Sequence, residues 1–172
     1  MPYIGIASHA PGRRRLTLFV GFMATPMTFR EMEERDIGRC IEVRTLVREQ
    51  RYSVETLRQL GITVESVTTM LATTHKGWVC EIDRRIVGFS MGNRSSGEFW
   101  VVAVLPEFEG RGIGRRLTEL AVQWLRAGAC PDIWLWTSPD VSTRAYAMYR
   151  KFGWQDCGVQ NGRRIMRLQH VF

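Results

Sequence analysis

The chain has 172 residues, of which 45% are hydrophobic and 24% are charged, so its length and composition fit one domain with its own core. The formal net charge of +7 includes three consecutive arginines at 13–15. The other arginines are scattered among acidic residues and form no basic stripe, which argues against a nucleic-acid-binding protein. The four cysteines lie far apart, without a histidine at ligand spacing. They predict reduced thiols in a cytoplasmic protein, and neither a metal site nor a disulfide framework.

Residues 1–26 differ in composition from the rest, because they contain no acidic residue and carry the arginines at 13–15. Their apolar run at 16–23 is shorter than the ~20 residues that a membrane span needs. It also lacks the cleavage site of a signal peptide. We therefore expect 1–26 to be an N-terminal extension, either flexible or upstream of the true start. Residues 27–172 are expected to form a single domain that is not bound to a membrane.

The sequence of the first half of that domain predicts a short strand, three helices and a meander of strands. A strand is expected at 28–31, and Asp36 is a natural N-cap for a helix with an apolar stripe beginning at Ile37. A second helix starts at Ser53 and ends at Gly61, and a third starts at Thr63. Strands at 77–83, 86–92 and 98–105, joined by turns rich in polar residues and glycine, form an antiparallel meander.

The second half alternates helices and strands. Apolar residues at helical spacing from Leu117 to Leu125 predict a helix that Gly128 ends. The run 133–137 (IWLWT) is almost entirely apolar, which is typical of a strand covered on both faces. The strand–helix–strand order makes it parallel to the strand at 98–105. A helix at 143–152 follows, and Asn161-Gly162 is a strong turn signal between strands at 154–160 and 163–169.

A glycine-punctuated turn between the strand at 98–105 and its helix is the most informative segment. Gly110, Gly112 and Gly114 fit neither the Walker spacing nor G-x-G-x-x-G. Glycines before a helix suit a phosphate, which the free N–H groups of the first turn can bind. With Val104 and Pro106 before it, the turn resembles the acyl-CoA pyrophosphate loop of the GNAT superfamily of N-acetyltransferases. Glu109 departs from that motif, because the family usually has Gln or Arg there.

A second segment, 142–154, resembles another GNAT motif, Asn-x-x-Ala-x-x-apolar-Tyr-Glu-Lys-x-Gly-Phe. Ala145, Tyr149, Lys151 and Gly153 match it, whereas Ser142 replaces the usual Asn. The two motifs stand in the family's order, with one helix and one strand between them. The resemblance implies an α/β (α+β) fold: a mixed, mostly antiparallel sheet with a central parallel pair and helices on both faces.

The resemblance also implies a cofactor and an activity, the transfer of an acetyl group from acetyl-CoA to an amine without a metal. Tyr149 would be the general acid that protonates the departing thiolate. The strand would hold the pantetheine and offer a backbone N–H to the thioester oxygen. The cofactor-binding residues expected on this basis are Val102, Ala103, Val104, Glu109, Gly110, Arg111, Gly112, Ile113, Gly114, Arg115, Ser142 and Arg144.

The general base and the acceptor are harder to predict. Glu98, at the start of the strand that leads to the loop, is the best candidate for the base, ahead of Glu81 and His75. The histidines at 9 and 170 lie in terminal segments and are poorer candidates. In the family the early helices flank the acceptor, so the residues that could touch it are Arg48, Glu49, Arg51 and Tyr52.

Two other function classes stay open at this stage. Glu109 and Ser142 are compatible with a non-catalytic acyl-CoA-binding module on the same fold. The positive charge leaves a nucleic-acid-binding domain as a less favoured alternative. The identity of the amine is not readable from the sequence, and a homodimer is an open expectation, because dimers are common in the family.

Overall fold

The computed structural model describes residues 26–49, 51–128 and 130–168. Except for Pro26, the expected extension at 1–26 lies outside the described residues, as do His9 and His170. The division into an extension and one domain at 27–172 stays a prediction.

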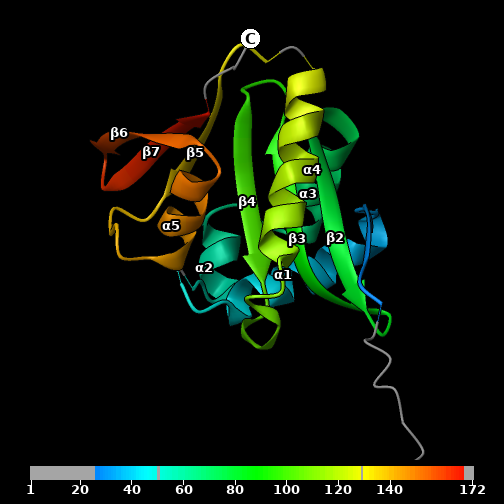
Figure 1. Ribbon diagram of the computed structural model, residues 1–172. Coiled ribbons are helices and arrows are strands. Elements are labelled where there is room, and N and C mark those ends of the chain that lie inside the picture. The colour runs from blue at the N-terminus through cyan, green and yellow to red at the C-terminus, as the bar shows by residue number, and fades with distance from the viewer. Residues whose placement is uncertain (1–25, 50, 129, 169–172) are drawn as a thin grey trace, which may run out of the picture.

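The centre of the molecule is a seven-stranded sheet with the order β1-β2-β3-β4-β5-β7-β6 (Figure 1). Every neighbouring pair is antiparallel except β4 and β5, which are parallel, so the predicted mixed sheet is confirmed. The strands are β1 (Thr28–Glu31), β2 (His75–Ile82), β3 (Arg85–Asn93), β4 (Glu98–Val104), β5 (Ile133–Thr137), β6 (Trp154–Gln160) and β7 (Arg163–Leu168).

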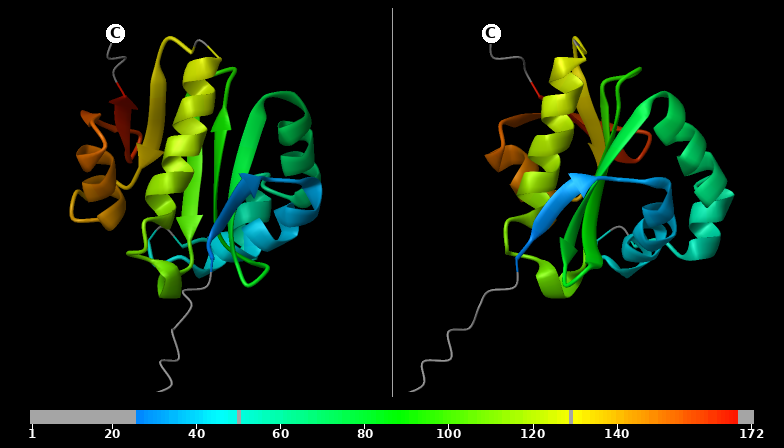
Figure 2. Two further views of the ribbon diagram at one scale, coloured as in Figure 1. Left: turned by 45° about the vertical axis from the view of Figure 1, so that its right-hand side comes forward. Right: turned by 90° about the vertical axis from the view of Figure 1, so that its right-hand side faces the viewer.

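Helices cover both faces of the sheet, as expected from the sequence. Figure 2 shows α1, α2 and α3 on one face and α4 on the other, and Figure 1 places α5 on the same side as α4. Short 3-10 turns precede α1 and α4, at Glu34–Asp36 and Pro106–Phe108. The helices are α1 (Ile37–Leu46), α2 (Val54–Gln59), α3 (Val64–Thr73), α4 (Ile113–Ala127) and α5 (Arg144–Lys151).

The three helix starts predicted for the first half of the domain are confirmed, but only two of them have a side-chain cap. The Ser53 hydroxyl accepts a hydrogen bond from the Thr56 N–H at 3.0 Å, and Thr63 forms a capping box with Ser66. Asp36 precedes α1 as predicted, but its side chain does not cap the helix. Instead, the Asp36 carboxylate accepts two hydrogen bonds from the Arg30 guanidinium, at 2.6 and 2.9 Å. A charged, bidentate partner competes better for the carboxylate than a backbone N–H does.

The two parallel strands pair at one position only. β4 and β5 pair at Glu98 and Trp134 and then diverge, while β5 stays in register with β7 over its whole length. This divergence leaves the edge of β4 open after its first residue. It also corrects the expectation that β5 is covered on both faces, because Trp134 and Trp136 are only half-buried whereas Ile133 and Leu135 are fully buried.

All four cysteines lie within the part of the chain that the structure describes. Three cysteines are buried and Cys157 is exposed, and none of the four forms a disulfide. No described helix is both long and apolar enough to span a bilayer.

Candidate active site

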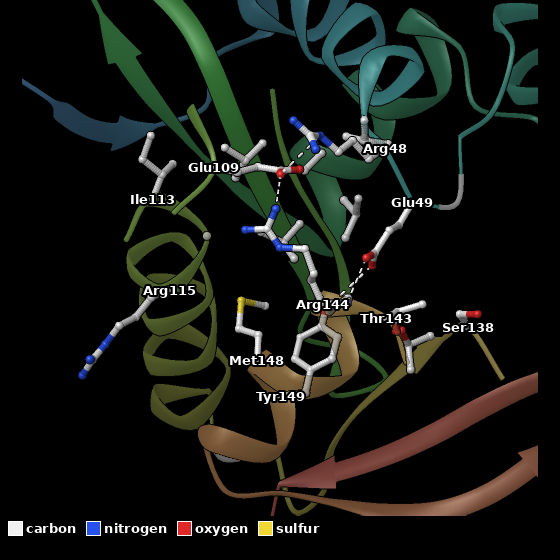
Figure 3. Close-up of a pocket in the computed structure, with 18 of the residues that line it drawn as sticks. Arg48, Glu49, Glu109, Ile113, Arg115, Ser138, Thr143, Arg144, Met148 and Tyr149 are labelled. Atoms are coloured by element: carbon white, nitrogen blue, oxygen red, sulfur yellow. Dashed lines mark hydrogen bonds and ion pairs between the residues drawn. The ribbon is translucent and has the colours of Figure 1, made fainter. Parts of the chain in front are cut away.

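The divergence of β4 and β5 opens a cavity of about 380 Å³, bordered by β4, β5 and the first turns of α4 and α5 (Figure 3). Most of the predicted cofactor-binding residues line it, although they come from two separate stretches of the sequence. Those that do are Val102, Ala103, Val104, Glu109, Gly110, Gly112, Ile113, Gly114, Arg115 and Arg144. The predicted catalytic residue Tyr149 also lines this cavity.

The glycine loop has the backbone geometry that its sequence predicts. Gly110 and Gly112 have φ of 76° and 81°, in the left-handed region that residues with a Cβ atom rarely adopt. Gly112 is the N-cap of α4, and its carbonyl accepts the first helical hydrogen bond, from the Arg116 N–H. The N–H groups of the first turn therefore have no partner within the helix, and they carry partial positive charge at the cavity. This arrangement fits a pyrophosphate.

Glu109 does not oppose an anion in the way that its charge alone would suggest. Its carboxylate forms an ion pair with the Arg144 guanidinium and lies 3.5 Å from Nε of Arg48 (Figure 3). The glutamate is neutralised, and the three side chains together keep one positive charge beside the glycine loop. The sequence could not show this, because Arg48 and Arg144 are far from Glu109 along the chain.

A carboxylate from the segment after α1 binds the start of α5. Glu49 accepts hydrogen bonds from the backbone N–H groups of Arg144, at 2.8 Å, and Ala145, at 3.3 Å. A negative charge at a helix N-terminus stabilises the helix. Arg48 and Glu49, expected near the acceptor, therefore lie in the first cavity and organise its wall.

Three of the predicted catalytic and cofactor-binding residues lie outside this cavity. The Arg111 side chain stacks on the Phe108 ring, at 5.0 Å from its centroid, and reaches the Glu107 carbonyl at 3.4 Å. The Ser142 N–H donates to the Asp140 carboxylate at 2.8 Å, which fixes the loop before α5. Glu98 lies in a neighbouring cavity.

Tyr149 is held in an aromatic cluster at the base of the first cavity. Its ring meets Phe99 and Trp154 edge to face, with centroids 6.3 and 5.8 Å apart, and the residue is 6% exposed. Burial raises the pKa of the Tyr149 phenol far above its usual value, although the positive charge of Arg44 opposes the shift. The phenol is therefore neutral throughout the physiological pH range and can donate a hydrogen bond.

A second cavity, of about 460 Å³, lies between the α1–α3 layer and the sheet. The two cavities share a wall formed by Arg44, Trp100, Val101, Trp136, Thr137 and Ser138. Glu98, Arg51 and Tyr52 line the second cavity only, so two of the four predicted acceptor contacts lie there. Burial raises the pKa of the Glu98 carboxyl, and the nearby charge of Arg163 lowers it by a smaller amount.

The other two candidate bases are placed less favourably than Glu98. Glu81 accepts a hydrogen bond from Arg30 at 2.7 Å, at the far edge of the sheet, and lines neither of these two cavities. His75 packs edge to face on Trp100, with centroids 5.5 Å apart, and burial lowers its pKa. It contacts the wall of the second cavity without lining the cavity itself.

Sequence reasoning missed several lining residues, of which only Met148 stands at a motif position, the apolar one before Tyr149. Arg44 enters from α1, Trp136 and Ser138 from the end of β5, and Phe108 and Met148 from the segments beside the glycine loop. The spacing of the others in the sequence carries no signal, because only the tertiary structure brings them to one cavity. Among the residues that the structure describes, no group of three or more His, Cys, Asp or Glu could hold a metal ion.

Comparison with known proteins agrees with this geometry. Residues 40–154 match the model of the acetyltransferase (GNAT) family. The chain belongs to the GNAT family. Both family motifs and both cavities fall largely within the matched segment.

Curated relatives of the GNAT chain include mycothiol acetyltransferases from several bacteria. The protein from Streptomyces griseus is 36% identical over 80 residues, which cover 44% of this chain and 26% of that protein. The one from Saccharopolyspora erythraea is 39% identical over 70 residues, covering 40% and 23%. The chain thus spans about a quarter of the length of these curated relatives.

Solved structures show the same fold. The PaiA N-acetyltransferase of Thermoplasma acidophilum, in complex with coenzyme A, matches with a TM-score of 0.73 and 16% identity, over 84% of this chain and 99% of that one. A GNAT acetyltransferase from Staphylococcus aureus matches with a TM-score of 0.68 and 14% identity, over 83% and 98%. At such identities the similarity concerns the fold.

Proposed function

We propose that this GNAT chain transfers the acetyl group of acetyl-CoA to a primary amine. The observation that supports this most strongly is the meeting of two cavities at the wall where β4 and β5 diverge. One cavity is lined by a glycine loop, a helix N-terminus and two arginines that bind Glu109, and these groups suit a pyrophosphate. The other carries a partly desolvated carboxylate, which suits an amine. The PaiA N-acetyltransferase of Thermoplasma acidophilum, which has the same fold, was solved in complex with coenzyme A, and this supports acetyl-CoA as the co-substrate.

Within this proposal the first cavity binds acetyl-CoA. The N–H groups of the first turn of α4 bind the pyrophosphate, and Gly110 and Gly112 let the backbone approach it. Arg144 and Arg48, held by Glu109, add positive charge beside the loop. The open edge of β4 at Val102, Ala103 and Val104 holds the pantetheine and offers a backbone N–H to the developing oxyanion.

The chemistry requires two proton movements, which we assign to residues of this chain. Acetyl-CoA supplies a thioester, whose carbonyl carbon bonds to the amine nitrogen as the C–S bond breaks. Glu98 accepts the proton that the amine loses, through water. Tyr149 donates a hydrogen bond and then its proton to the sulfur that departs, and solvent restores the phenol.

Thermal unfolding with and without acetyl-CoA tests cofactor binding. Acetyl-CoA at about 100 times its Kd should stabilise the protein by about 2.7 kcal/mol, a rise in Tm of roughly 5–10 °C. Gly114→Asp should abolish the rise without harming the fold. A Cβ atom there would lie 3.6 Å from Met148 Sδ, an ordinary contact, and an acidic residue suits the first turn of a helix but repels a pyrophosphate.

Gly38→Asp is the matched control, because Gly38 occupies the same position in α1 and has open space around it. This variant should keep the full rise in Tm. Release of thiol in the presence of amines then tests turnover. A rise in Tm without turnover for any amine would support an acyl-CoA-binding module, and the absence of a rise at millimolar acetyl-CoA would contradict the proposal.

A further inference from the structure

The second cavity has the size of a binding site for a small molecule. Its volume of about 460 Å³ falls within the ~300–1,000 Å³ that ligand pockets commonly have. It reaches from the shared wall into the layer between α1–α3 and the sheet. A molecule in it can therefore extend well beyond an amino group placed at the shared wall.

The floor of this cavity is apolar. Its floor includes Leu57 and Met91, which are 2% and 1% exposed, and Phe89, which is 5% exposed. Trp100 and Trp136 form its aromatic side at the shared wall. Removing apolar ligand surface from water against such walls is favourable by about 25 cal/mol per Å². A polar ligand body would gain little there and would lose its hydration.

The charges around the cavity are unbalanced. Glu98 is the one carboxylate among the described residues that line it, whereas Arg44, Arg51 and Arg163 bring three guanidinium groups. Arg51 Nε donates to the Thr45 carbonyl at 2.8 Å, and the Arg44 guanidinium lies 4.8 Å from the centre of the Tyr52 ring. Both cations are thus fixed in place by their neighbours. A ligand with several amino groups would meet net repulsion beyond the single site at Glu98.

We propose that the acceptor is a molecule with one primary amine on a bulky apolar body about the size of an aromatic ring, such as an arylalkylamine. Polyamines and aminoglycosides are excluded by the same charges and walls. The amine lies between the shared wall and Glu98, and the apolar body fills the space between α1, α2 and the sheet. This inference rests on the proposed acetyl transfer and specifies its acceptor.

The inference is tested by comparing kcat/KM for phenethylamine, ethylamine and spermidine, measured as thiol release from acetyl-CoA. We expect phenethylamine to exceed ethylamine by about tenfold or more, because its ring is buried, and spermidine to fall below phenethylamine by a similar factor. Equal or higher kcat/KM with spermidine or ethylamine would overturn the inference, while acetyl transfer itself would stand.

A variant that fills the cavity gives an independent test. Ile41, on α1, lines the second cavity and is half-buried, so Ile41→Trp should reduce kcat/KM for phenethylamine about tenfold and leave ethylamine little changed. Val64→Trp is the control, since Val64 is 41% exposed at the start of α3 and does not line the cavity. Both variants should keep the rise in Tm with acetyl-CoA, which shows that they are folded.

Direct binding separates failure of this inference from failure of the proposed function. Trp100 and Trp136 line the cavity, so phenethylamine should change the tryptophan fluorescence without any turnover, and spermidine should not. Binding of phenethylamine without acetylation would uphold the cavity's selectivity and contradict the catalytic proposal. The absence of binding together with the absence of preference in turnover would reject the inference.

Discussion

At the scale of single residues, the environment of a side chain decides what its chemistry can do. Tyr149 would be an unremarkable phenol in water, but the ring cluster with Phe99 and Trp154 removes it from solvent and raises its pKa. Glu109 would be an obstacle beside a pyrophosphate, but Arg48 and Arg144 neutralise it. In both cases the neighbouring side chains, more than the residue type, determine the chemistry of the residue.

Replacing Tyr149 by phenylalanine isolates the hydroxyl, because the ring and its packing are kept. We expect Tyr149→Phe to lower kcat by about 10²-fold or more, since proton donation to a departing group contributes roughly that factor. The rise in Tm with acetyl-CoA should stay as in the parent protein. Because the raised pKa keeps the phenol protonated, the parent's kcat should show no loss from Tyr149 ionisation below about pH 10. Unchanged kcat in Tyr149→Phe would contradict the assignment.

At the scale of elements, the single paired position of β4 and β5 controls the geometry of both cavities. The Trp134 N–H donates to the Gly97 carbonyl at 3.2 Å, just before the paired residues Glu98 and Trp134. Gly97 has a φ of 73°, and a Cβ atom built on it would lie 2.0 Å from the backbone oxygen of Asp132. The strands can approach at this point because residue 97 has no side chain.

Gly97→Ala should therefore destabilise the protein by about 3 kcal/mol, through backbone strain and a clash that no side chain can relieve. The matched control is Gly158→Ala, which has a φ of 88° but open space around the new methyl group. This variant should lose only about 1 kcal/mol of unfolding free energy, because the left-handed conformation is the only unfavourable effect there. Denaturant unfolding of the two variants measures both values. Equal losses would show that the clash at Asp132 has no effect.

At the scale of the whole molecule, one ionic cluster joins the first strand, the second strand and the start of α1. Arg30 in β1 binds Asp36 before α1 at 2.6 Å and Glu81 in β2 at 2.7 Å. Asp36 is 4% exposed and also accepts from the Glu33 N–H at 2.8 Å. The hydrogen bond from Arg30 is the main reason why the pKa of the Asp36 carboxyl lies below its usual value.

This shift fixes the sign of a pH effect on stability. Because the folded state favours the ionised carboxylate, Asp36 stabilises the protein above its unfolded pKa of about 3.9, and this stabilisation is lost as pH falls through the lower folded value. Asp36→Asn should cost about 2 kcal/mol at pH 7 and less below pH 4, as measured by denaturant unfolding at several pH values. Asp132→Asn, which breaks an exposed pair with Arg167, should cost less than about 1 kcal/mol at either pH.

The features that depend on neighbours along the chain could be predicted from the sequence. The succession of strands and helices, the parallel pair of β4 and β5 and most element boundaries were predicted, because periodicity, caps and turns are local signals. The pairings of β1 with β2 and of β5 with β7 were not predicted. The positive φ values at Gly110 and Gly112 and the turn at Asn161-Gly162 belong to the same class. The cofactor loop was predictable for this reason, since strand, loop and helix are continuous in sequence.

Which side chains share a cavity depends on the tertiary structure alone. Glu49 binds the start of α5 across 95 residues, and Glu109 is neutralised by arginines from two other segments. The second cavity draws its walls from α1, α2 and both parallel strands, so no single motif encodes it. Coulombic attraction and burial depend on which residues are close in space. The way the sheet opens between β4 and β5 decides which side chains come that close.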